Sequence, residues 1–404
     1  MLLGARSAED LGLHWTGTPG SAAQLQIVGG QLVDRHAEAA HNRSAFLFVT
    51  CQVGAERALK SEFARLWPAF HFAYSRPGFI TFKLPSDHDL APDFDSRSVF
   101  ARACGFSLGK ATAADLSERA MEVWRATEDR PCDALHVWQR DMAPAGFHGF
   151  DPHITPEAHQ AETILRQSWP GASGDEGLEL ARIARPGQTV LDCVLVEPNE
   201  WWIGYHRAAS EDSTFPGGLR EIALPPDAVS RAFLKMDEAL EWSALPIRRG
   251  QRFVEIGCAP GGASQALLAR GLTVIGIDPA QVDARVLAHP RFTHIHKRGA
   301  DVRRREFRGV TWLAADMNVA PQYTLDTVEA IATHPTVSIQ GLLLTLKLLE
   351  WELAEQIPDY LERIRSWGYP EVRAKQLAHN RQEICVLAVK RRAKDGVVAP
   401  RRGG

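Results

Sequence analysis

The sequence has few of the features that mark a secreted, membrane-spanning or metal-binding protein. Its 404 residues include only six cysteines, and none of them forms a C-x-x-C pair. So few cysteines cannot build a disulfide scaffold, so we expect reduced, mostly buried thiols in a cytoplasmic protein. No H-E-x-x-H motif or Cys/His cluster is present, so we expect no metal. No apolar run approaches the roughly 18 residues that cross a bilayer, and we expect neither a membrane span nor a signal peptide.

The chain as a whole also lacks a large excess of charge of one sign, although its two parts carry opposite net charges. Hydrophobic residues make up 45% and charged residues 24%, which excludes a disordered or collagen-like chain, and the net charge is −3. From Gln251 onward, 22 Lys and Arg face 16 Asp and Glu, a net of +6, whereas the first 250 residues carry −9. Basic runs at 303–305 and 390–392 are either solvated faces or surfaces for phosphate groups.

The length predicts two or three domains, and pattern changes divide the chain further. Strand-like runs at 46–51 and 79–84 flank a helical pattern at 55–67, which is typical of a small α+β unit. A second such unit combines helical patterns at 111–124 and after Pro156 with a strand at 134–138 and a hairpin at 190–205. We therefore expect a poorly ordered leader (1–43), two α+β modules (44–108 and 109–210), an α/β domain (225–392) and a basic tail (393–404).

Two adjacent tryptophans in the second unit permit two interpretations. Trp201 and Trp202 could form a platform on which RNA bases stack. Neighbouring residues of a strand face opposite sides of a sheet, however, so at least one of the two belongs to the core. We favour packing over stacking.

The region 225–392 alternates strands and helices, and this predicts a doubly wound, mostly parallel sheet. Its first helix should cover 228–240, with Asp227 as its N-cap. The remaining elements are expected as strands at 253–257, 272–277, 292–295, 311–315, 341–346 and 383–390 and helices at 264–269, 325–332 and 357–367.

A glycine-rich turn follows the first of these strands. In Gly257-Cys258-Ala259-Pro260-Gly261-Gly262 the glycines allow a ligand to approach the backbone, and the following helix offers free N–H groups. Asp278, at the end of the next strand, is placed to accept hydrogen bonds from a ribose diol. The pattern favours an adenosine-type cofactor over a plain tight turn, but by itself it leaves NAD and S-adenosylmethionine open, although G-C-A-P-G-G fits the pyrophosphate fingerprint poorly.

The segment EIGCAPGG (255–262) resembles the first motif of the FtsJ-like ribose 2′-O-methyltransferases. Within that family the chain most resembles the RlmM type, which modifies a cytidine of 23S ribosomal RNA. Further similar segments are SRAFLK (230–235), ADM (315–317), LTLKL (344–348) and AKQL-x-H-x-RQEI (374–384). The match covers about 228–392 and continues more loosely through the front half. The resemblance implies a Rossmann-like methyltransferase domain preceded by ferredoxin-like and RNA-binding THUMP-like modules.

The resemblance also implies site residues, a cofactor and a partner. It implies S-adenosylmethionine as cofactor, RNA (23S rRNA or a pre-ribosomal particle) as substrate, no metal, and a cytoplasmic enzyme that we expect to be monomeric. Catalysis would fall to a tetrad of Lys235, Asp316, Lys347 and Glu383. The cofactor would be held by Ser230, Gly257, Cys258, Ala259, Pro260, Gly261, Gly262, Asp278, Asp301 and Asp316, with Asp301 at the adenine amino group.

The residue types of the tetrad suit the removal of a proton from a ribose hydroxyl. Lys347 can act as the base only if its pKa falls well below its ordinary value; burial and the second cation, Lys235, favour this, whereas the charges of Asp316 and Glu383 oppose it. The chain departs from the family pattern in three places: Glu255 replaces an aspartate, Ala263 replaces an aromatic residue, and the segment after Lys347 (349–352) is acidic rather than basic.

Three rival functions remain at this point. The fold would also suit an NAD-dependent oxidoreductase, although the P-G-G loop and the tetrad residues speak against it. A non-catalytic RNA-binding or ribosome assembly factor could keep the fold, although all the tetrad residues are present. A different RNA, such as transfer RNA or a messenger cap, is the third possibility.

Overall fold

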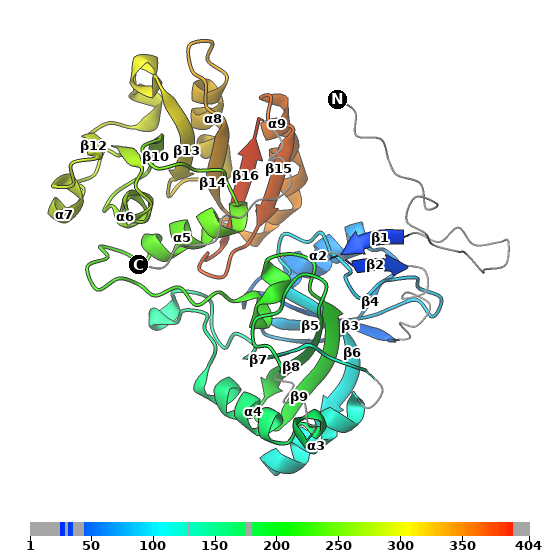
Figure 1. Cartoon of the computed structure of the whole chain (residues 1–404). Coiled ribbons are helices and arrows are strands. Elements are labelled where there is room, and N and C mark those ends of the chain that lie inside the picture. Colours follow the sequence, from blue (N-terminus) through cyan, green and yellow to red (C-terminus); the bar gives the residue numbers. More distant parts are fainter. Residues whose placement is uncertain (1–24, 29–30, 35–43, 128–129, 174–179, 391–404) are drawn as a thin grey trace, which may run out of the picture.

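The computed structural model describes residues 25–28, 31–34, 44–127, 130–173 and 180–390. Over these residues the chain forms two halves, each built on a seven-stranded sheet (Figure 1). We call residues 44–210 the N-terminal half and 225–390 the C-terminal half. A separate antiparallel pair, β1 (Leu25–Val28) and β2 (Gln31–Asp34), lies within the expected leader, which is therefore not devoid of regular structure. The rest of the leader and the basic tail lie outside the described residues.

The sheet of the N-terminal half has the strand order β4-β5-β3-β6-β9-β8-β7. All its neighbouring strands run antiparallel except β7 and β8, which are parallel. Its strands are β3 (Phe46–Thr50), β4 (His71–Arg76), β5 (Phe79–Lys83), β6 (Ala103–Ala111), β7 (Ala134–Gln139), β8 (Thr189–Glu197) and β9 (Glu200–Arg207). The predicted strands at 46–51, 79–84 and 134–138 and the predicted hairpin are confirmed.

Two of the three α-helices described in this half begin at side-chain caps. Asp115 accepts the N–H groups of Ser117 and Glu118, and Thr155 accepts that of Ala158. Such caps satisfy backbone donors that the first helical turn leaves without partners. The helices are α2 (Glu56–Leu66), α3 (Leu116–Ala126) and α4 (Pro156–Gln167).

Strand β6 is the main departure from the prediction in this half. We expect a helix from residue 111, but Ala111 ends β6, and α3 begins at Leu116. The strand forms because β3 and β9 pair with its two edges, and these partners are far away in the sequence. The expected module boundary at 108/109 falls inside β6, so the two expected modules share one sheet.

Both tryptophans of β9 are buried, which confirms packing over base stacking. Trp201 is 2% exposed and Trp202 is 7% exposed. The ring of Trp202 lies 5.0 Å from that of Phe79, and its Nε1 donates to Ser107 Oγ over 2.9 Å. Neither ring is free to meet a base.

The C-terminal half has the strand order β12-β11-β10-β13-β14-β16-β15. The strands from β12 to β14 are parallel, and β16 and β15 are antiparallel, which confirms a mostly parallel sheet. Its strands are β10 (Arg252–Ile256), β11 (Thr273–Ile277), β12 (Phe292–Ile295), β13 (Val310–Asp316), β14 (Gly341–Lys347), β15 (Glu371–Lys375) and β16 (Glu383–Val389). The edge strand β15 was not predicted, because EVRAK is short and only Val372 and Ala374 alternate with its charged residues.

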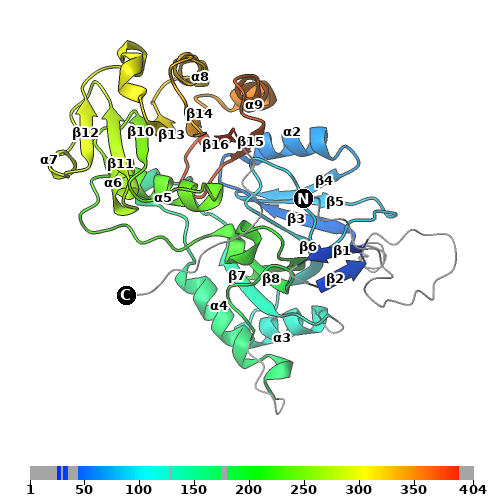
Figure 2. The same cartoon turned by 45° about the horizontal axis from the view of Figure 1, so that its top comes forward.

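Helices cover both faces of this sheet, as Figure 2 shows. Alternate residues of β10 reach opposite layers: Phe253 packs with α5 and α6, whereas Val254 packs with α8 and α9. This period of two is what a doubly wound sheet requires. The helices are α5 (Ala232–Ser243), α6 (Gly262–Ala269), α7 (Ala284–Leu287), α8 (Pro321–Ala332) and α9 (Ile357–Ser366).

Helix α5 begins later than we expect. Arg231, not Asp227, precedes its first residue, so the predicted start at 228 and the predicted cap are wrong. The side chain of Gln265 in α6 accepts the Val229 N–H and donates to the Asp227 carbonyl. These contacts hold the preceding segment against α6 in a non-helical path.

The two halves are packed against each other rather than joined by a free linker. One apolar cluster contains residues of both sheets, and at its edge the rings of Phe100 and Trp351 lie 6.2 Å apart. Gln376 Nε2 donates to Gln52 Oε1 over 2.8 Å in a buried contact between the halves. In the described part of the chain no helix is long and apolar enough to span a membrane, and all six cysteines are free.

Candidate active site

The four residues of the predicted tetrad come from four elements that meet at the carboxyl ends of the parallel strands of the C-terminal sheet. Asp316 ends β13, Lys347 ends β14, Glu383 begins β16, and Lys235 lies in α5. Because β14 and β16 are antiparallel and pair Lys347 with Glu383, the end of one strand meets the start of the other. The structure therefore brings all four predicted residues together.

The tetrad forms a closed arrangement in which each lysine contacts both carboxylates. Lys235 Nζ lies 3.1 Å from Asp316 Oδ2 and 2.7 Å from Glu383 Oε1. Lys347 Nζ lies 2.7 Å from Asp316 Oδ1 and also pairs with Glu383 Oε2. Glu383 is almost fully buried, with 3% of its side chain exposed, whereas 16% to 20% of each other side chain is exposed. The charges compensate one another and remain within reach of a bound substrate.

The carboxylates decide the protonation of Lys347. Burial lowers the pKa of Lys347, but Asp316 and then Glu383 outweigh burial and hold the pKa above its ordinary value. Burial raises the pKa of Asp316, but Lys235 and Lys347 outweigh it and hold that pKa below the ordinary value. The carboxylates therefore affect the pKa of Lys347 more strongly than burial does, and Lys347 is an ammonium group at neutral pH.

The glycine-rich turn lies directly beside the tetrad. Gly257 has a φ of +85°, and a Cβ there would collide with the backbone oxygen of Asp316. A Cβ at Gly262 would collide with the hydroxyl of Ser230. The glycines let the ends of β10 and β13 and the segment before α5 approach one another closely. Gly257 and Ser230, two of the predicted cofactor residues, thus lie close to Asp316 of the tetrad or to the glycine-rich turn.

Two observations show that this turn suits an adenosine-type cofactor. The Ser230 hydroxyl is buried and makes no hydrogen bond, so a polar donor or acceptor is available at the turn. Asp278 follows β11 and accepts the Ala259 N–H over 3.0 Å and the Ala280 N–H over 2.8 Å, which fixes its carboxylate at the edge of the turn. A carboxylate accepts about four hydrogen bonds, so capacity remains for a ribose diol.

The comparisons with known proteins agree with this geometry. Residues 228–356 match a family described as "FtsJ-like methyltransferase". The C-terminal half contains an FtsJ-like methyltransferase domain. The chain is 27% identical to "Ribosomal RNA large subunit methyltransferase M" of Hahella chejuensis, across 73% of this chain and 75% of that protein. It is 25% identical to the protein of the same name from Haemophilus influenzae, across 84% and 98% of the two chains.

Among solved structures, the chain is similar to 1,6-didemethyltoxoflavin-N1-methyltransferase of Burkholderia thailandensis with bound S-adenosylhomocysteine. The identity is 12%, the TM-score is 0.31, and the match covers 41% of this chain and 79% of that one. The cofactor of an FtsJ-like methyltransferase domain is S-adenosylmethionine, and the site residues described above suit it.

The other predicted cofactor residues of the FtsJ-like domain lie in different surroundings. Cys258 is 2% exposed, and burial raises the pKa of its thiol, so its side chain belongs to the core and only its backbone is available. Pro260 is exposed on the turn, whereas Gly261 is buried. Asp301 is exposed in a 3₁₀ helix (Gly299–Asp301) that follows β12. β12 is the edge strand of the sheet on the side of β11, the strand that Asp278 follows.

Glu255, the longer acid of the first motif, is buried in the FtsJ-like domain. It is 2% exposed and accepts a hydrogen bond from Ser264 Oγ. Burial raises its pKa to about 8, against the opposing effect of Ser264. Glu255 is therefore largely a neutral carboxylic acid at neutral pH.

Glu238 holds the loop that leads to Glu383. Located one turn after Lys235 in α5, it accepts the N–H groups of Ala378 and His379 and bonds to His379 Nδ1 over 2.9 Å. Asn380 Nδ2 in the same loop donates to Glu383 Oε1 over 3.3 Å. Sequence reasoning missed Glu238 and Asn380 as site residues; their only signal was their position inside segments that match the family.

Sequence reasoning also missed a loop of the N-terminal half that reaches the site. Arg381, whose N–H donates to Glu383, extends its guanidinium to the Gly146 carbonyl over 3.3 Å. Arg231, just before α5, pairs with Asp151 of the same loop. Phe147 in this loop is 56% exposed. No local sequence pattern could have placed this loop beside the tetrad.

Proposed function

We propose that this protein is an S-adenosylmethionine-dependent RNA 2′-O-methyltransferase that acts on a cytidine of 23S rRNA, as naked RNA or in a pre-ribosomal particle. The observation that carries the proposal is the closed tetrad of Lys235, Asp316, Lys347 and Glu383 beside the glycine-rich turn. The names of the relatives, which are ribosomal RNA large subunit methyltransferases, support the choice of RNA. We further propose that the protein acts in the cytoplasm as a monomer.

S-adenosylmethionine supplies an electrophilic methyl group that needs no further activation. The chain's own task is to hold a ribose hydroxyl in line with that methyl group and to take up its proton. Alignment of two reactants alone can contribute several orders of magnitude to a rate. We assign Lys347 the proton transfer and assign Lys235, Asp316 and Glu383 the positioning of Lys347 and the hydroxyl.

The proton transfer sets a condition on pH. Lys347 accepts a proton only as a neutral amine, and the two carboxylates favour its ammonium form. The active fraction should therefore rise about tenfold per pH unit below the pKa of Lys347. The two carboxylates hold Lys347 in a fixed position, but they also leave only a small fraction of it as the neutral amine at neutral pH.

The cofactor roles follow the positions of the residues around the turn. We propose that Gly257, Ala259, Pro260, Gly261 and Gly262, with the backbone of Cys258, form its cradle. The free Ser230 hydroxyl and Asp316 would contact the methionine part of the cofactor, Asp278 the ribose diol, and Asp301 the adenine amino group. The Gly262 N-terminal end of α6 adds free N–H groups.

The N-terminal half would bring the RNA to the site. Its packing against the FtsJ-like domain fixes its position relative to the tetrad. Phe147 offers an exposed ring on which a base can stack, and Arg381 places a cation near the same loop.

The first experiment measures methyl transfer by the full chain from labelled S-adenosylmethionine to a 23S rRNA transcript. We expect Lys347→Ala to lose about 10³-fold in rate while calorimetry shows unchanged binding of S-adenosylmethionine. The control is Lys110→Ala, which removes a partly buried lysine from an ion pair with Glu200, away from the tetrad elements. Undiminished activity of Lys347→Ala would refute the assigned base.

A second set of measurements separates the rival functions. Binding of NAD but not of S-adenosylmethionine would favour an oxidoreductase, and rRNA binding without methyl transfer would favour an assembly factor. Mapping of 2′-O-methyl groups in RNA from cells with and without this gene identifies the nucleotide. A site lost from transfer RNA alone would contradict the rRNA assignment.

A further inference from the structure

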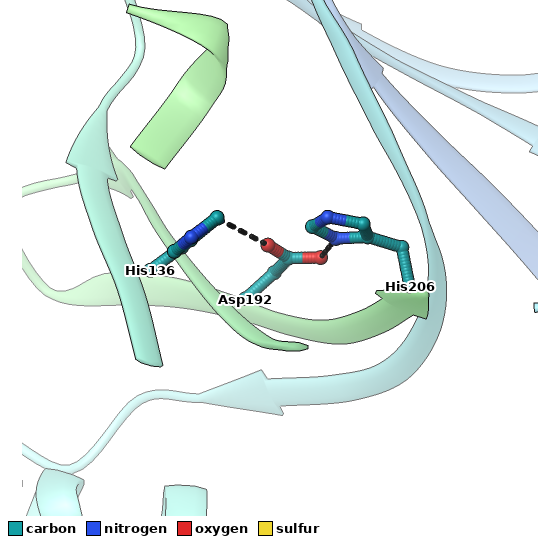
Figure 3. Close-up of side chains that lie close together, drawn as sticks. All are labelled: His136, Asp192 and His206. Carbon is teal, nitrogen blue, oxygen red and sulfur yellow. Dashed lines mark hydrogen bonds and ion pairs between the residues drawn. The ribbon is translucent and has the colours of Figure 1, made fainter. Parts of the chain in front are cut away.

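Three buried side chains of the N-terminal half converge at a place remote in sequence from any part of the tetrad. Figure 3 shows His136 of β7, Asp192 of β8 and His206 of β9 facing one another. One ligand atom from each lies within 4.8 Å of those of the other two. His136 is 0% exposed, Asp192 is 1% exposed and His206 is 8% exposed. In the described part of the chain this is the one such group of His, Cys, Asp or Glu side chains.

Sheet pairing explains how distant residues meet here. His136 and Asp192 are direct partners across the parallel strands β7 and β8. Asp192 lies opposite Gly204 of β9, so His206, two residues further along, is its diagonal neighbour on the same face. Gly105 of β6 leaves room for the carboxylate, since a Cβ there would lie 2.8 Å from Asp192 Oδ2. The strands themselves hold the three side chains in position.

The hydrogen bonds of His206 leave one of its nitrogens facing Asp192. His206 Nε2 lies 2.8 Å from the Ser213 carbonyl, and because a carbonyl only accepts, this nitrogen carries the hydrogen. Nδ1 then faces Asp192 Oδ2 over 2.7 Å. Two lone pairs would repel at that distance, so a positive charge belongs between them, either a proton or a metal ion.

A proton satisfies only part of the cluster. The ring of His136 meets the backbone of Thr214 but makes no hydrogen bond of good geometry, and Asp192 Oδ1 makes none either. His136 Nδ1 and Asp192 Oδ1 are 4.0 Å apart, too far for a hydrogen bond. Ligands of a tetrahedral Zn²⁺ lie about 3.3 Å apart, so an ion fits between these atoms after small shifts. A single cation would then engage all three side chains.

The surroundings also match those of metal sites. A metal-bound histidine usually donates its other ring N–H to a carbonyl or carboxylate, as His206 does to Ser213. The three side chains line a cavity of about 240 Å³ together with Cys104 and Lys375, among others, which leaves room for a water as a fourth ligand.

We propose that His136, Asp192 and His206 bind a divalent transition-metal ion, with Zn²⁺ as the ion of choice. Two imidazoles and one carboxylate are a ligand set that zinc uses with a water in the fourth position. The ion would tie β7, β8 and β9 to the 3₁₀ helix Asp212–Thr214, which contains Ser213. Asp212 of this helix pairs with Lys375 of β15 over 3.2 Å, so the site also supports the contact between the two halves.

The test uses the full chain, stripped with a chelator and dialysed against Zn²⁺. We expect about one Zn²⁺ per chain by elemental analysis, and a thermal unfolding midpoint that rises when Zn²⁺ is added. Asp192→Asn and His136→Asn keep similar shapes but should each retain less than about a tenth of that zinc. The control is His71→Asn, which removes an exposed histidine of the same sheet and should bind zinc like the unchanged chain.

Folding of each variant is checked by circular dichroism and by its binding of S-adenosylmethionine. Co²⁺ in place of Zn²⁺ should give the visible absorption of a four-coordinate site, and this absorption should be absent from Asp192→Asn. Zinc contents that are equal in the folded Asp192→Asn variant and the unchanged chain would overturn the proposal. So would a folded, unchanged chain that retains no zinc after dialysis.

Discussion

The tetrad and the His136–Asp192–His206 cluster are two groups of polar side chains, one partly exposed and one buried, with different pairing. In the tetrad each charge has partners of opposite charge, and each lysine contacts both carboxylates. In the histidine cluster His206 and one oxygen of Asp192 are well paired, whereas neither nitrogen of His136 makes a hydrogen bond of good geometry. Buried polar atoms without partners are costly, so one group is complete as it stands and the other calls for a ligand.

Their positions in the two sheets explain the difference. The tetrad lies at strand ends, where α5 and the loop before β16 can add side chains from outside the sheet. The histidine cluster lies within β7, β8 and β9, where the side-chain positions are set by register alone. Strand ends thus allow adjustable chemistry with a substrate, whereas paired strands hold their side chains in a fixed arrangement.

The largest effect should follow from removal of the central charge of the tetrad. Asp316→Asn keeps the shape but leaves Lys235 and Lys347 with one carboxylate fewer. We expect methyl transfer to fall about 10³-fold in single-turnover assays. Asp192→Asn, the same change in the histidine cluster, should leave the rate within about threefold when the protein is folded. Equal losses in both variants would remove the functional distinction between the clusters.

A substitution in the tetrad should also reduce stability more than a substitution in the histidine cluster. Lys347→Met leaves two carboxylates beside a single lysine, and we expect about 3–5 kcal/mol less stability in urea denaturation. In metal-free protein His136→Leu removes ring nitrogens that make no hydrogen bond of good geometry, and we expect a change within about 1 kcal/mol. A large loss for His136→Leu without metal would show that its ring has a partner in solution.

The pH profile should report the carboxylates around Lys347. In the unchanged chain we expect log rate to rise with pH beyond the ordinary lysine pKa, because Asp316 and Glu383 raise the pKa of Lys347. Glu383→Gln removes one of these charges, so the pKa of Lys347 falls and the plateau begins at a lower pH. The measurement is the rate of methyl transfer between pH 7 and 11. A profile that stays in place would contradict proton transfer to Lys347.

The smallest effect should come from the loop that joins the N-terminal half to the tetrad. Phe147→Ala removes an exposed ring without touching the core, so stability should not change. We expect KM for RNA to rise about 3- to 10-fold with little change in kcat. Phe72→Ala, a comparably exposed ring in β4, serves as the control. A similar rise in KM for both variants would contradict a specific role of Phe147 in RNA binding.

The C-terminal half was predicted far better from the sequence than the N-terminal half. Its parallel strands are short apolar runs between helices, and each strand in this pattern is visible locally. In the N-terminal half β6 contains Gly105 and Gly109 and forms only because β3 and β9 pair with it. Local pattern cannot show such pairing, and the shared sheet was missed for that reason.

Local sequence was enough to predict the alternating α/β fold, the glycine-rich turn and the four residues of the tetrad, because each lies in a short, recognisable segment. The balance of charges at Lys347 could not be predicted in this way, since the distances to Asp316 and Glu383 depend on where β13 and β14 end and where β16 begins. The tertiary structure alone brought together His136, Asp192 and His206. Register across three strands sets that meeting, and register depends on partners that lie far apart along the chain.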